Sequence, residues 1–111
     1  MAIVKSIPAK KIIHGHVIET AVVSVVSELD YRTNGEDTII LRGVPMANVV
    51  LDSGTTDHVT VKAMTHIIIR PDVGLIDEEY HEITADKFAC IEFRFVNGNW
   101  YILSSDGLKQ S

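Results

Sequence analysis

Residues Ala89–Ser105, which read ACIEFRFVNGNWYILSS, decide the fold of this 111-residue chain. Side chains alternate between the two faces of a strand, so the apolar residues at every second position from Ile91 to Phe95 share one face. The residues between them are charged and share the other face. Asn97 and Gly98 follow, and this dipeptide tolerates the positive φ angles of a two-residue hairpin turn. The stretch therefore predicts a β-hairpin with one buried face.

Short strand-like runs also fill the middle of the chain. They are rich in Ile, Val and Thr, are separated by turn-forming segments, and span Thr38–Arg42, Asn48–Asp52, His58–Lys62 and His66–Arg70. Short strands without long helical intervals are typical of sandwiches, jelly rolls and barrels, and they disfavour parallel βαβ folds. We therefore expect an all-β protein, with an antiparallel β-sandwich or jelly-roll-like single domain.

Three of these runs, NVVLD, HVTVK and HIIIR, resemble one another. A solenoid built of stacked rungs would need several units of fixed period, and the spacing of these runs is irregular. We therefore interpret the similarity as ordinary strand composition.

The chain divides by composition into three parts. Residues 1–16 are expected to form an extended N-terminal arm, 17–107 the β domain and 108–111 a loose tail. Three of the ten basic residues lie in the first part: Lys5, Lys10 and Lys11. Residues 17–30 suit either a strand or an amphipathic helix, and their density of valine favours the strand.

The overall composition limits the function classes. A content of 46% apolar and 23% charged residues fits one globular domain. The formal net charge of -5 disfavours bulk binding to nucleic acid or to an anionic membrane, because both attract positive charge. The apolar runs are too short for a transmembrane helix. The single cysteine, Cys90, is expected to be a small buried hydrophobe in a reducing cytoplasm.

The residues capable of chemistry do not assemble into a recognisable reactive site. His14 and His16 have a usable metal spacing, but the sequence selects no third ligand. The loop Asp72–Glu79 lacks the alternating carboxylates of a calcium loop, and Ser53–Asp57 lacks a Gly-x-Ser-x-Gly elbow and predicts a turn. We therefore expect no catalytic residues, no cofactor and no bound metal.

Two adjacent aromatic residues in the closing strand face opposite ways. One of Trp100 and Tyr101 is expected in the core, and the other is a candidate contact for a sugar or a protein partner.

The closing sequence IEFRFVNGNWYILSSDG resembles the last hairpin of many tailed-phage virion surface proteins, in which a tight turn and a Trp-Tyr-x-Leu/Ile-Ser-Ser strand finish a small β domain. The preceding VTVKAMTHIIIRPD and ITADKFACIEF are similar to their order of short strands, a loop and an apolar strand. The resemblance covers roughly residues 58–107. In its small size and single domain, the chain resembles a capsid decoration (cement or staple) protein of a short-tailed phage more than it resembles a fibre protein.

This resemblance implies a non-enzymatic protein on the capsid exterior, made in the host cytoplasm. It implies binding to the major capsid protein across subunit boundaries, with self-association on the shell and no nucleic-acid or membrane partner. Exposed strand edges are expected to pair with neighbours. The expected contact residues are Lys5, Lys10 and Lys11, with Tyr31 and Tyr101 as candidate anchors. The alternative is a carbohydrate-binding or receptor-facing module of a phage fibre or spike, with a glycan as its partner.

Overall fold

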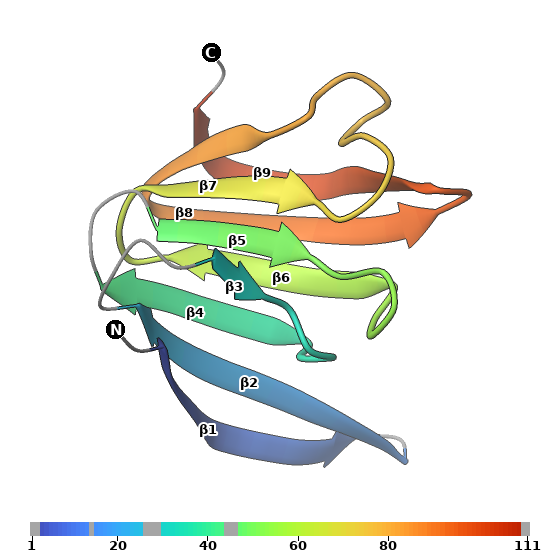
Figure 1. The fold of residues 1–111 in the computed structure, drawn as a ribbon. Helices are drawn as coiled ribbons and strands as arrows, with labels where there is room; N and C mark the ends of the chain where they lie inside the picture. Colours follow the sequence, from blue (N-terminus) through green and yellow to red (C-terminus); the bar gives the residue numbers. More distant parts are fainter. Residues whose placement is uncertain (1–2, 14, 26–29, 44–46, 110–111) are drawn as a thin grey trace.

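The structure is a computed structural model that describes residues 3–13, 15–25, 30–43 and 47–109. Every regular element within these ranges is a strand (Figure 1). The strands are β1 (Ile3–Ile13), β2 (His16–Val25), β3 (Asp30–Arg32), β4 (Thr38–Gly43), β5 (Ala47–Leu51), β6 (His58–Ala63), β7 (Ile67–Pro71), β8 (Ile83–Val96) and β9 (Asn99–Lys109). The all-β prediction is confirmed, and the described part of 17–30 is a strand up to Val25.

These strands form one mixed sheet that curls into two facing layers (Figure 1). β2, β4 and β6 run parallel in one layer, and β3, β5 and β7 run parallel in the other. Successive strands alternate between the layers, so the chain winds as a coil. One turn of the coil takes 18 residues of sequence between the paired residues Thr20 and Thr38. The next turn takes 22 residues between the paired residues Thr38 and Thr60.

The expectation of antiparallel pairing is wrong for the pairs that these six strands form with one another, which are all parallel. It is correct for β1 with β2 and for β8 with β6, β7 and β9. Antiparallel neighbours arise from hairpins. Here each strand is followed by a strand of the opposite layer, and the chain therefore returns to its own layer in the same direction. The runs NVVLD and HIIIR, which we interpreted as ordinary strand composition, belong to the stacked parallel neighbours β5 and β7. The unequal turns hide this repeat from a search for a fixed period.

The β8–β9 hairpin covers the end of the coil, and its predicted turn is confirmed. Asn97 and Gly98 have φ angles of 51° and 86°, as a tight two-residue turn requires. The first residues of β8 pair with β7 and its later residues pair with β6, so β8 joins the two layers. The strand changes register between Ala85 and Cys90, and Phe88 within this break has a φ of 75°.

Alternate side chains of both layers meet in one hydrophobic core. Ile91 and Phe93 are buried and Phe95 packs against the core, as their alternation predicted. Trp100 is the buried member of the aromatic pair, and its ring centroid lies 5.2 Å from that of Phe95. Cys90, expected to be buried, is only half-buried, because it lies on the outward face between two inward residues.

The N-terminal segment is part of the sheet over residues 3–13, where an extended arm was expected. β1 pairs antiparallel with β2 from Ile3, opposite Val25, to Ile13, opposite His16, with one interruption between Ser6 and Ala9. Pro8 lies at a register shift on this edge strand, where a missing N–H group is tolerated.

The C-terminal segment is also paired further than the expected loose tail allows. Leu108 lies opposite Ala85 and Lys109 opposite Thr84. Residues 110 and 111 lie outside the described part of the chain.

Candidate functional site

Two of the predicted contact residues, Lys5 and Tyr31, lie together around a buried carboxylate. The side chain of Glu36 is fully buried, and its Oε2 atom is 2.6 Å from the Lys5 ammonium nitrogen. The Tyr31 hydroxyl donates a hydrogen bond to the same oxygen, and the Asn34 backbone N–H donates to Oε1 at 2.6 Å. The Lys5 nitrogen also lies 6.0 Å from the centroid of the Tyr31 ring. These contacts join β1, β3 and the turn before β4.

Hydrogen bonding keeps the Glu36 carboxylate ionised in spite of its burial. Burial raises the pKa of Glu36, but the hydrogen bonds from Lys5, Tyr31 and Asn34 outweigh it and hold this pKa below its usual range. Burial, together with the hydrogen bond to Glu36, raises the pKa of Tyr31 far above its usual value. The cluster therefore holds a negative carboxylate beside a positive ammonium and a neutral phenol.

A shallow hollow of about 330 Å³ lies against this cluster and is lined by Lys5, Tyr31, Arg32, Thr33, Asn34 and Asp52. Its polar groups are already engaged within the chain. Arg32 Nε donates to Asp52 at 2.8 Å, and the Thr33 hydroxyl accepts the Asp52 backbone N–H at 2.8 Å. This arrangement stabilises the base of the β1–β2 hairpin, so Lys5 and Tyr31 serve an internal contact that the sequence did not predict.

The other two predicted lysines lie further along β1. Lys10 is at the register position opposite Glu19, and Lys11 is opposite Ile18. The β4 segment contacts β2 only as far as Glu19, whose carbonyl accepts the Asp37 backbone N–H at 3.0 Å, so Lys10 lies at the limit of this pairing and Lys11 lies beyond it. Their side chains lie outside the described part of the structure.

Tyr101 lies on the outer face of β9, half-exposed, and its hydroxyl donates a hydrogen bond to Glu78 at 2.8 Å. This hydrogen bond raises the pKa of the Tyr101 phenol. The expectation that one of the aromatic pair lies in the core is confirmed by Trp100, and a contact role for Tyr101 stays a prediction. Tyr101 lies on β9, which pairs with β8, whereas Lys5 and Tyr31 lie on β1 and β3 at the two ends of the sheet order. The five predicted contact residues therefore do not form one site.

The acidic loop Asp72–Glu79 is held against the body by specific hydrogen bonds. Asp72 accepts hydrogen bonds from the Ser53 backbone N–H and hydroxyl at 2.8 and 2.7 Å and from the Trp100 indole N–H at 3.2 Å. Ile76 within the loop is fully buried. The Ser53 hydroxyl therefore has a structural partner, in agreement with the predicted turn over Ser53–Asp57.

His58, the first residue of β6, lies between two aspartate side chains. Its Nε2 atom lies 2.9 Å from Asp37 Oδ1 and its Nδ1 atom lies 2.9 Å from Asp57 Oδ1. Hydrogen bonds to Asp57 and Asp37 raise the pKa of His58, whose ring bridges the two carboxylates. Asp37 also accepts the Glu19 backbone N–H at 2.7 Å, which ties the bridge to β2.

Within residues 3–13, 15–25, 30–43 and 47–109, no three His, Cys, Asp or Glu side chains converge as metal ligands. His14, one member of the candidate metal pair, lies outside these residues. The same part of the chain contains no helix with the length and apolar character needed to cross a bilayer.

Comparison with known proteins adds no family to this description. No protein-family model, no curated protein and no solved structure matches the chain.

Proposed function

We propose that this chain is a non-enzymatic capsid decoration protein that binds the outer shell of a phage across subunit boundaries. In this proposal the two facing layers form a β-sandwich body, and the β1–β2 hairpin takes the role expected of the N-terminal arm. The closing hairpin at Ala89–Ser105 supports the proposal through its resemblance to virion surface proteins.

The projection of the β1–β2 hairpin is the observation that carries the proposal. Residues 16–18 of β2 pair with β1 alone, because the contacts of the β4 segment with β2 begin at Glu19, whose carbonyl accepts the Asp37 backbone N–H at 3.0 Å. Figure 1 shows this hairpin at one edge of the body, with its tip turned away from the inner strands. A projecting hairpin can reach a neighbouring subunit while the body stays on the first one.

The outer edge of β1 supplies the means of attachment. No other strand among the described residues pairs with that edge, since β1 ends the sheet. An open edge strand can add to a strand of another protein through backbone hydrogen bonds. Lys11 lies on the projecting part and Lys10 at its base, and both supply positive charge to an acidic shell surface. Many weak copies then add up to a stabilised shell, because their contacts act together.

Co-sedimentation with shells assembled from the major capsid protein of the same phage tests this proposal. We expect saturable binding that weakens by at least about fivefold in Lys10→Glu and in Lys11→Glu, because each variant loses a charge contact of about 1 kcal/mol and adds a repelling charge. Arg94→Glu makes the same change of charge on the outer face of β8 and should bind as the wild type does. A wild-type protein that stays in the supernatant contradicts the function. Full binding by both lysine variants contradicts only the role of the hairpin.

A carbohydrate-binding or receptor-facing module of a phage fibre or spike is the second candidate function. Tyr101 favours it, because its half-exposed ring is held beside the Glu78 carboxylate. An aromatic face next to a carboxylate suits the apolar and hydroxyl groups of a sugar. This function predicts saturable binding on a glycan array that is lost in Tyr101→Ala, and an array without signal contradicts it.

A further inference from the structure

An aromatic side chain is held outward at the break in β8. Phe88 is 56% exposed, the most exposed of the large hydrophobic side chains described. Its φ of 75° is a backbone conformation that bulky residues rarely adopt. With Met64 it lines a hollow of about 500 Å³, whose other walls are Arg42, Gly43 and Lys87. We call this surface the Phe88 hollow.

Cations surround the Phe88 hollow. The Lys87 ammonium nitrogen lies 5.1 Å from the centroid of the Phe88 ring, and Lys62 donates a hydrogen bond to the Phe88 carbonyl at 2.8 Å. Arg42 and Lys87 have no carboxylate partner among the described side chains, while the nearby Asp86 pairs with His66 at 3.2 Å. A cationic rim around an exposed aromatic fits a partner that is both acidic and apolar.

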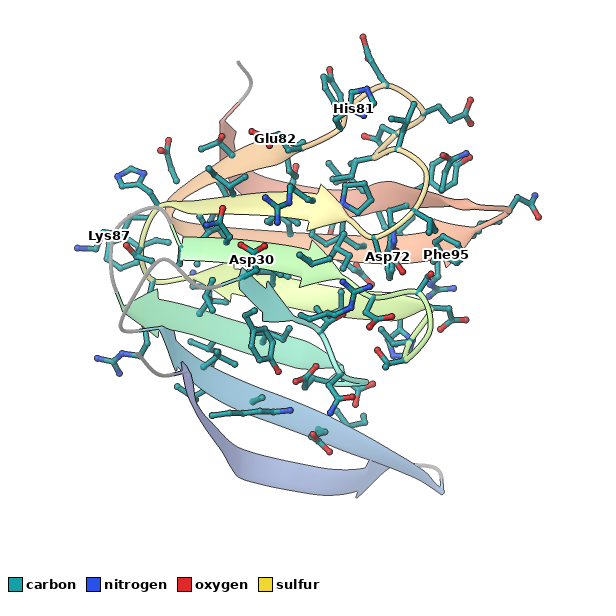
Figure 2. The ribbon with its side chains drawn as sticks, viewed as in Figure 1. Asp30, Asp72, His81, Glu82, Lys87 and Phe95 are labelled. Carbon is teal, nitrogen blue, oxygen red and sulfur yellow. The ribbon has the colours of Figure 1, made fainter. Side chains whose placement is uncertain are left out.

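The chain itself carries a surface of that kind at the opposite end of its strands. Three consecutive acidic residues of the acidic loop are exposed: Asp77, Glu78 and Glu79. Val73 and Tyr80 beside them are 50% and 37% exposed. In Figure 2, the Lys87 label marks the end of the strands at the Phe88 hollow, and the Asp72 label marks the start of the acidic loop at the other end.

The acidic loop is already fixed in shape, which lowers the entropic cost of binding. Asp77 accepts the Ile102 backbone N–H at 2.9 Å, and Glu78 accepts the Tyr101 hydroxyl at 2.8 Å. Asp77 and Glu78 both have positive φ angles, so the loop turns sharply there. Its charged and apolar side chains are therefore presented together.

We propose that the Phe88 hollow of one copy binds the acidic loop of a second copy. The two surfaces differ, so the contact is head-to-tail, and it leaves a free hollow at one end of the pair and a free loop at the other. Repetition gives chains or rings of copies. This self-association goes beyond the proposed function, because it needs no shell and is measured with the purified protein alone.

Sedimentation velocity on the full chain tests the self-association. A contact between one loop and one hollow is small and gives a weak complex, so the protein concentration is raised to about 1 mM in the measurement. At about 20 mM NaCl we expect the weight-average mass to rise with concentration, and at about 500 mM NaCl we expect association at least tenfold weaker. A wild-type protein that remains monomeric at low salt overturns the proposal.

Exchanging the charges of the Phe88 hollow and the acidic loop tests whether these two surfaces form the contact. Arg42→Glu/Lys87→Glu makes the hollow acidic like the loop, and Glu78→Lys/Glu79→Lys makes the loop basic like the hollow. Each variant alone should lose association at least tenfold, and an equimolar mixture should recover it, because each loop then meets a hollow of opposite charge. Circular dichroism verifies that both variants are folded.

Arg94→Glu is the matched control for the single variant Arg42→Glu, since both change the charge by the same amount. We expect Arg42→Glu to weaken association and Arg94→Glu to leave it unchanged. Equal losses in the two, or a mixture of the charge-exchanged variants that stays monomeric, overturn the assignment of these surfaces.

Discussion

The ammonium nitrogen of Lys5 lies 2.6 Å from Oε2 of Glu36, a carboxylate with no exposed surface. Lys5 belongs to the edge strand β1, and Glu36 lies in the turn before β4. The pair therefore anchors the projecting hairpin to the body. The proposed function depends on this anchor, because a hairpin that grips a shell must transmit load to the rest of the protein.

Removal of the lysine charge should destabilise the protein. In Lys5→Met the Glu36 carboxylate stays buried with one donor fewer, and we expect the free energy of unfolding to fall by about 2 kcal/mol. This is less than for a fully buried pair, because the Lys5 side chain is 26% exposed. Urea denaturation measures the change.

The double variant Lys5→Met/Glu36→Gln tests whether the uncompensated Glu36 carboxylate causes the loss of stability. If the cost comes from the uncompensated carboxylate, replacing Glu36 as well should recover part of the lost stability. A double variant as unstable as the sum of the two single variants contradicts this explanation.

His58 should give the stability a dependence on pH near neutrality. Its pKa is raised in the folded state by Asp57 and Asp37, so the folded protein holds the proton more tightly than the unfolded chain. The stabilisation is therefore complete below the unfolded pKa of about 6.5 and is lost as the pH rises through the higher folded pKa.

NMR titration of the His58 ring measures that pKa directly. We expect a midpoint above about 6.5, and a lower midpoint in Asp57→Asn, which removes one of the two carboxylates. A midpoint at or below about 6.5 in the wild type means that the carboxylate bridge does not hold the charge.

Two glycines with positive φ should respond very differently to alanine. At Gly74 a Cβ atom would overlap the Gly98 carbonyl oxygen and lie 2.8 Å from Asn99 Oδ1, while at Gly98 nothing lies within 4 Å. Gly98→Ala should cost about 1 kcal/mol of unfolding free energy, from backbone strain alone. Gly74→Ala should cost at least about 3 kcal/mol, because the acidic loop must move off the hairpin turn. Equal costs in thermal or urea unfolding contradict this close packing.

The closing hairpin could be predicted because its signals are local. Alternation from Ile91 to Phe95 and the Asn97-Gly98 turn need no knowledge of the rest of the chain. The parallel coil could not be predicted in the same way. Its partners are set by the lengths of turns between layers, and these lengths differ, as the positions of Thr20, Thr38 and Thr60 illustrate.

The cluster around Glu36 could not be predicted either, because its contacts come from distant strands. Glu36 lies in a polar turn sequence, and only the approach of Lys5 and Tyr31 from other strands removes it from water. The break in β8, by contrast, is indicated by a pattern in the sequence. Odd-numbered residues of this strand point inward, such as Ala85 and Ala89, yet Lys87 between them is charged and exposed. A lysine at an inward position indicates a bulge.

The copy number of this chain in gradient-purified virions of the phage that the proposal implies tests the central proposal most directly. Quantitative mass spectrometry with labelled reference peptides measures it against the major capsid protein. Decoration of the shell predicts a fixed stoichiometric ratio, with the chain lost from particles when the hairpin lysines Lys10 and Lys11 are replaced by glutamate. Trace amounts in mature virions contradict a role as a capsid decoration protein.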